Sequence, residues 1–209
     1  TSYIHEFMQK IYFLFIVSLS ICLLGCNQTQ KPRIFYPISV NEKGDTTFQT
    51  IANFEMLNQN GEKVTTQKFA GKVYVLDFFF ASCLGICKKM TSEMGKVQAA
   101  CKDLPGVQFV SVTVDVEGDS IPALKKYADS KKIDADKWDL LRPNNQTEAT
   151  HIAQDIFHVS AFKDSTGSIQ HDERFILVDK QGRIRGYYHV NEEEKLQQLV
   201  KDIKYLVEN

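Results

Sequence analysis

Two cysteines, four residues apart, follow directly after a strongly apolar run. Residues 73–80 read Val-Tyr-Val-Leu-Asp-Phe-Phe-Phe, which has the length and composition of a buried strand. Cys83 and Cys87 come next, in the order Cys83-Leu84-Gly85-Ile86-Cys87. If a helix begins near Leu84, residues four apart share one of its faces, so both sulfurs lie in its first turn. The chain is therefore expected to fold around a buried strand that leads into a helix, with two thiols at the junction.

This pair of thiols is open to several kinds of chemistry. The free N–H groups and the positive dipole end of a helix N-terminus favour thiolate over thiol. Lys88 adds a cation beside Cys87. Two adjacent thiolates can close a disulfide, exchange one with a partner, or bind a soft metal ion. A Cys-x3-Cys motif also occurs as two buried cysteines or as a structural disulfide, so the rest of the chain has to decide.

The first residues have the pattern of an export signal. Lys10 precedes an apolar run over residues 11–24, which is shorter than the stretch of about 20 residues that spans a membrane. The run ends in Leu-Leu-Gly-Cys, which resembles a bacterial lipobox whose cysteine becomes the lipidated first residue of the mature protein. We expect residues 1–25 to be a lipoprotein signal peptide and Cys26 to carry the lipid, rather than a plain secretory signal or an uncleaved anchor.

Composition and charge indicate one exported domain on a tether. Residues 26–50 are polar, contain Pro32 and Pro37, and show no sustained period, which predicts a tether; residues 51–209 then form a single domain. A net charge of −1 gives no basic footprint for a nucleic acid. The cysteines left as thiols are Cys83, Cys87 and Cys101, too few for a disulfide scaffold. We expect redox or metal chemistry, with Cys101 buried on a helix face.

Strand patterns alternate with helix patterns along the domain, which predicts an α/β layered sheet. The expected elements are a β-hairpin over 54–65, strands over 73–80, 107–114, 175–178 and 183–188, and helices from Leu84 to about residue 104, after a Ser120 cap, over 146–157, and from an Asn191 cap to the end.

Four segments of the chain together resemble the Sco (SenC) proteins: residues 78–91, 110–115, 138–141 and 171–179. The resemblance covers roughly residues 50–208. It implies a thioredoxin-like α/β fold, with a central mixed β-sheet flanked by helices and an N-terminal β-hairpin. Members of this family are membrane-tethered and bind one copper ion through the two cysteines of a Cys-x3-Cys motif and a distant histidine. They resemble copper chaperones and thiol reductases for the CuA centre of cytochrome c oxidase.

The resemblance implies Cys83, Cys87 and His171 as the copper ligands. His171 also fits on its own, because it follows a flexible stretch over 166–170 that could bring the ring over the thiols. Two thiolates and an imidazole suit Cu(I) and also permit Cu(II). Asp115 matches an acidic position of the family and is expected to orient the ligands without binding the metal itself. Where family members commonly carry proline, this chain has Leu84 and Lys88, which predicts a more pliable loop.

We therefore expect a lipid-anchored protein of the cell envelope, facing the periplasm or the outside, that delivers copper to, or matures, the CuA site of cytochrome c oxidase. Its expected partner is the CuA-bearing subunit or another copper or thiol client. The alternative is a thiol–disulfide oxidoreductase in which Cys83 and Cys87 keep client cysteines reduced. A peroxidase is a third and more distant hypothesis, because Cys83 lacks the upstream threonine and proline of a peroxidatic cysteine. A structural binding module is a fourth hypothesis. Met90 and Met94 are at helical spacing and are expected to pack in the core rather than bind copper.

Overall fold

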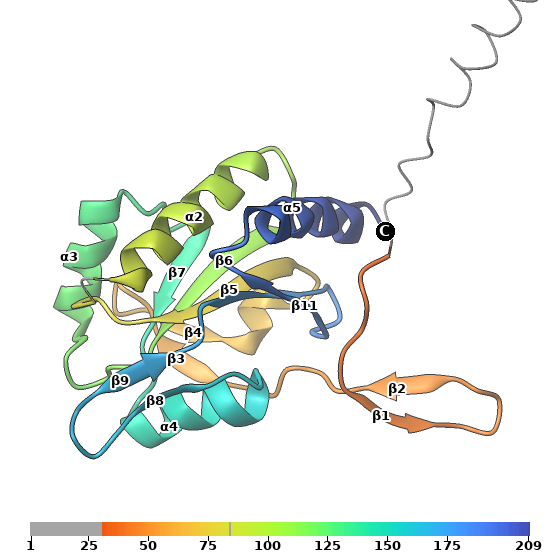
Figure 1. Cartoon of the computed structure of the whole chain (residues 1–209), viewed down its shortest axis with the longest axis horizontal. Helices are drawn as coiled ribbons and strands as arrows, with labels where there is room; N and C mark the ends of the chain where they lie inside the picture. Colours follow the sequence, from red (N-terminus) through yellow and green to blue (C-terminus); the bar gives the residue numbers. More distant parts are fainter. Residues whose placement is uncertain (1–30, 84) are drawn as a thin grey trace, which may run out of the picture. The chain divides into compact units, whose positions relative to one another are not determined.

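The computed structural model describes residues 31–83 and 85–209 (Figure 1). The expectations for residues 1–30, including the signal peptide and lipidation at Cys26, lie outside the described residues, as does Leu84. The strands are β1 (Pro37–Val40), β2 (Thr46–Phe48), β3 (Glu55–Leu57), β4 (Lys63–Thr65), β5 (Val73–Phe79), β6 (Val107–Thr113), β7 (Trp138–Leu141), β8 (Ala161–Lys163), β9 (Ile169–His171), β10 (Arg174–Val178) and β11 (Ile184–His189). The helices are α2 (Ile86–Ala100), α3 (Ile121–Lys131), α4 (Gln146–His151) and α5 (Glu193–Glu208), with a 3-10 turn η1 (Thr66–Phe69) and a π-helical turn η2 (Ile152–Ile156).

A mixed five-stranded sheet in the order β11-β10-β5-β6-β7 forms the centre of the domain. Strands β5, β6 and β7 are parallel, whereas β10 runs antiparallel to both β5 and β11. Every residue of β5 is buried, as its continuous apolar run predicts. The pairs β1–β2, β3–β4 and β8–β9 form separate two-stranded sheets. The expected mixed sheet and the hairpin over residues 54–65 are confirmed.

Both faces of the sheet are covered. Alternation along β5 sends Val75 and Phe79 into the core under α2, α3 and α5, and sends Leu76 and Phe78 into a second core with η2. Figure 1 shows α2 and α5 on one side of the sheet and α4 on the other. Because β5 and β6 are parallel neighbours, their carboxyl ends lie at the same edge of the sheet, and the loops that follow them meet there.

The helix ends agree with the sequence in one case and differ in another. Ser120 caps α3 as expected, since its hydroxyl accepts a hydrogen bond from the Ala123 N–H. The expected Asn191 cap of the last helix is wrong: α5 is preceded by Glu192, without a side-chain cap. The Asn191 side chain instead donates to Glu173 and accepts from Lys89, two partners that are distant in sequence. Asn191 thus lies one residue before the N-cap position of α5.

The segment expected to be an irregular tether contains regular structure. Within it, β1 and β2 pair as a hairpin, and the turn between them is held by Asn41, whose side-chain oxygen accepts from two backbone N–H groups. Just before the hairpin, the Phe35 N–H bonds to the Ile184 carbonyl, and Arg185 donates to the carbonyls of Pro32 and Arg33. Residues 32–36 thus pack on β11. None of the helices in the described part of the chain combines the length and apolarity needed to cross a bilayer.

Candidate metal centre

Three potential ligands, distant in sequence, come together at the edge of the sheet where β5 ends. One donor atom from each of Cys83, Cys87 and His171 lies within 4.8 Å of the other two. Cys83 belongs to the loop after β5, Cys87 to the first turn of α2, and His171 to the end of β9. The structure therefore brings together the three residues that the sequence and its family resemblance indicate.

The two sulfurs have different exposure. Cys87 is buried, with 1% of its surface accessible, beneath the first turn of α2, whereas Cys83 is half-buried in the loop. Two backbone contacts hold that loop: the Cys83 N–H bonds to the Phe80 carbonyl, and the Ala81 N–H bonds to the Asp119 carboxylate. A partner molecule can therefore reach Cys83 directly but reaches Cys87 only past Cys83 or His171.

The His171 ring presents an unprotonated nitrogen to the thiols. Its Nδ1 lies 3.0 Å from the Asp172 backbone oxygen, and because a carbonyl only accepts hydrogen bonds, Nδ1 carries the proton there. Nε2 then has a free lone pair, and it lies 3.1 Å from the Cys87 sulfur. The Phe80 ring also packs against the imidazole in a T-shaped arrangement, with the ring centroids 5.8 Å apart. The ring thus has the tautomer and the orientation of a metal ligand.

The electrostatics of the metal-free site correct one expectation. Burial raises the pKa of Cys87 strongly, and a hydrogen bond with Cys83 adds to this. Burial also lowers the pKa of His171, so its imidazole is neutral. The prediction that the helix terminus and Lys88 favour a Cys87 thiolate is therefore wrong for the metal-free protein, because burial of the sulfur favours the neutral thiol and Lys88 is exposed. The sulfur of this neutral thiol lies 3.1 Å from His171 Nε2.

The donor set fits a soft transition metal ion. Thiolate and imidazole ligands suit copper, and two sulfurs with one nitrogen match the coordination that Cu(I) accepts. The contact between Nδ1 and the Asp172 carbonyl is the usual support behind a metal-binding histidine. Because cysteine binds a metal ion as thiolate, metal binding would have to displace the proton of the Cys87 thiol.

Asp115 lies in the loop after β6, and its bonds do not lead to the three ligands. Its carboxylate accepts from the Lys163 ammonium at 3.0 Å and from the Gly118 N–H at 3.2 Å. The hydrogen bonds identified among the described residues do not join it to Cys83, Cys87 or His171. Its expected role, to orient the ligands without binding the metal itself, stays a prediction. Any such role acts through Lys163.

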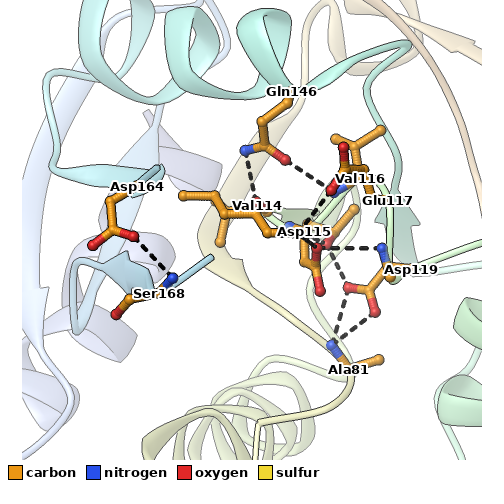
Figure 2. Close-up of polar contacts among 12 residues, drawn as sticks. Ala81, Val114, Asp115, Val116, Glu117, Asp119, Gln146, Asp164 and Ser168 are labelled. Atoms are coloured by element: carbon orange, nitrogen blue, oxygen red, sulfur yellow. Dashed lines mark hydrogen bonds and ion pairs between the residues drawn. The ribbon is translucent and has the colours of Figure 1, made fainter. Parts of the chain in front are cut away.

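Sequence reasoning missed two residues around the site, Asp119 and Lys163. Figure 2 shows Asp119 bonded to Ala81. The only sequence signal for Asp119 was a second acid four residues after Asp115 at a strand end, and Lys163 carried no signal.

The other sequence candidates do not belong to the set of three ligands. Met90 and Met94 are fully buried in the core, and Cys101 is a buried free thiol in the same core, as expected. The remaining histidines of the domain make ordinary contacts: His151 with Asp155, His158 with Gln49, and His189 near Glu173.

The fold and the site define a class: a thioredoxin-like domain with a dithiol at the start of a helix and a histidine that faces it. Residues 42–208 match the SCO1/SenC family, and the chain belongs to that family. The SCO1 protein homolog of Bacillus subtilis (strain 168) is 28% identical over 191 residues, covering 90% of this chain and 92% of that protein. The expected family and fold are thereby confirmed.

Two solved structures extend the comparison. A SCO1/SenC family lipoprotein from Bacillus anthracis str. Ames superposes with a TM-score of 0.70 at 31% identity, covering 75% of this chain and 94% of that one. BsSco, described as a member of the Sco family of cytochrome c oxidase assembly proteins with a disulfide switch, gives a TM-score of 0.72 at 26% identity, covering 87% and 99% of the two chains.

Proposed function

We propose that this protein is a membrane-tethered copper-binding protein that delivers copper to the CuA site of cytochrome c oxidase, or matures that site. The observation that carries the proposal is the meeting of the Cys83 and Cys87 sulfurs with a correctly oriented His171 Nε2. Membership of the SCO1/SenC family and likeness to BsSco, an oxidase assembly protein, support the choice of client.

Exposure of the site is consistent with transfer rather than storage. A storage site would enclose all its ligands, but here Cys83 is half-buried at the domain surface and His171 lies on a two-stranded sheet outside the central one. A thiolate of a client can approach Cys83 without unfolding the domain. One copper ion per protein follows from the single set of three ligands in the described residues.

We also propose that a lipid on Cys26 anchors the protein in the cell envelope. The lipobox-like sequence and the likeness to a Bacillus anthracis lipoprotein support this. Expression of the whole precursor with a Cys26→Ser variant tests it: wild type should partition with membranes after radiolabelled fatty acid incorporation, and the variant should not carry label.

Copper titration of the purified domain tests the binding function. We expect one Cu(I) per protein in competition with a coloured chelator, and an affinity that falls by about 10-fold or more in His171→Ala, because a three-ligand site loses one donor. His151→Ala, which alters an exposed histidine, is the matched control and should bind as wild type does. A wild type that binds no stoichiometric copper would rule the proposal out.

The second candidate function is thiol–disulfide exchange, in which Cys83 attacks a client disulfide and Cys87 resolves the mixed disulfide. It is favoured by the presence of two adjacent free thiols, one of them accessible, and by the disulfide switch of BsSco. His171→Ala separates the two functions. A copper carrier loses affinity in this variant, whereas a reductase keeps its rate with a model disulfide.

A further inference from the structure

The loop after β6 bonds to both halves of the candidate metal centre. We call residues 114–119 the bracket loop. Toward the thiols, the Asp119 carboxylate accepts the Ala81 N–H at 3.0 and 3.2 Å, two residues before Cys83 (Figure 2). The Val114 N–H also bonds to the Phe79 carbonyl. Toward the histidine, Asp115 accepts from Lys163 on β8. The bracket loop is therefore the point at which the two halves are tied.

The bracket loop is itself held firmly. Asp119 is buried and also accepts the Thr113 hydroxyl, and the Gln146 side chain bonds to the backbone of Val114 and Val116 (Figure 2). Gly118 allows a close approach: a Cβ atom there would lie 2.3 Å from an Asp115 oxygen. Asp115 is thus a fixed anion rather than a mobile surface carboxylate.

The hairpin that carries His171 has little support of its own. Its strands β8 and β9 pair only with each other, three residues each, and Ala161 stands opposite His171. An isolated two-stranded hairpin is marginal in water, so its place depends on contacts with the rest of the domain. Ala161 is buried at the base of the hairpin, and Lys163, at the far end of β8, reaches across to Asp115 at 3.0 Å and to Glu117 at 2.9 Å.

We propose that Lys163 is a positioning residue of the metal centre: its ion pair with Asp115 ties the His171 hairpin to the bracket loop, and so to the loop that carries Cys83. The pair is better shielded than most surface pairs, because the Lys163 and Asp115 side chains are only 21% and 11% exposed. Removing the Lys163 ammonium frees the hairpin to move the imidazole away from the sulfurs. The consequence for copper rests on the function proposed above, whereas the consequence for the hairpin does not.

Lys163→Met tests the inference, because methionine keeps an apolar stem and removes the charge. In the metal-free protein we expect faster amide hydrogen exchange across residues 169–171, and in the copper titration an affinity about 10-fold lower. Lys163→Arg should restore both. Lys63→Met is the matched control, since Lys63 also lies on a two-stranded sheet and pairs with a carboxylate, Glu55, at 2.8 Å; it should change neither measurement.

A double-mutant cycle shows whether Lys163 acts through the histidine. In a His171→Ala background, Lys163→Met should cause no further loss of copper affinity. An equal loss in both backgrounds would overturn the inference, and so would unchanged hydrogen exchange in the hairpin. If the wild type binds no copper, the function proposed above fails, while hairpin exchange in Lys163→Met still decides the positioning role.

Discussion

Copper affinity is expected to fall by more than about 100-fold when Cys87 is replaced with alanine, a larger loss than for a residue behind the ligands. Cys87 supplies one of two sulfur donors from the buried side of the site, and it is the hydrogen-bond partner of His171 Nε2. Its loss leaves one thiolate and one imidazole, which hold Cu(I) weakly. Chelator competition at fixed pH measures the change.

Cys101→Ala is the matched control, because Cys101 is also a buried free thiol on the same side of the sheet but faces the core at the end of α2. It should bind copper as the wild type does. Cys83→Ala should lose as much affinity as Cys87→Ala. Full binding by either variant would contradict the proposed site, and equal losses in all three would point to unfolding, which a thermal melt of each variant detects.

Local features of the fold could be predicted from sequence because their causes are local. The apolar run of β5, the Ser120 cap and the helical spacing of Met90 and Met94 each depend on neighbouring residues, and the structure has all of them. The β1–β2 hairpin was missed for a related reason. Its strands are three or four residues long and exposed, with Ile38 and Val40 facing solvent, so no buried face imposes an alternating pattern.

Much of the candidate site depends on contacts between distant segments, which could not be predicted from neighbouring residues. The spacing of Cys83 and Cys87 indicates a site by itself, but His171 lies 84 residues from Cys87. The family resemblance, supported by the flexible stretch before His171, indicated that it joins them. Lys163 and Asp119 act through contacts between segments that are distant in sequence. Such contacts produce no repeating residue pattern from which they could be predicted. The pKa of Cys87 was misjudged because charges and helix ends can be read from sequence, whereas desolvation depends on the packing around the sulfur.

Asp77 is an ionisable residue in the middle of the apolar strand β5, and the candidate metal centre described above does not use it. It is 1% exposed on β5, its Oδ1 has no hydrogen-bond partner among the residues that the structure describes, and Ser111 bonds to its carboxyl. Ser111 in turn accepts from the Trp138 indole at 2.9 Å. Burial raises the pKa of Asp77 to about 7. The folded protein therefore holds a proton on Asp77 that the unfolded chain releases at much lower pH.

Because of this shift, the contribution of Asp77 to the stability of the metal-free protein falls as pH rises. Between the ordinary pKa of 3.8 and the folded value of about 7, the folded state binds one proton more than the unfolded state, so the free energy of unfolding decreases with pH across that window. A shift of about 3 pKa units corresponds to a loss of about 4 kcal/mol in the free energy of unfolding. The whole loss is reached once the pH exceeds the folded pKa of Asp77. Asp77→Asn removes the ionisable group and is expected to be more stable than wild type by about that amount at pH 8, with little difference at pH 4.

Urea unfolding of the metal-free protein at several pH values measures the effect, and the difference between wild type and Asp77→Asn isolates Asp77 from other titrating groups. Asp139→Asn is an informative control, because Asp139 is equally buried but pairs with the Lys68 ammonium at 2.7 Å. Its loss leaves that ammonium without its partner, so this variant should be less stable than wild type at pH 8. The two substitutions are expected to change the free energy of unfolding in opposite directions for a single reason. Burial disfavours an ionised carboxylate only where no cation compensates its charge. Equal stability of Asp77→Asn and wild type at every pH would show that Asp77 is ionised in the folded core.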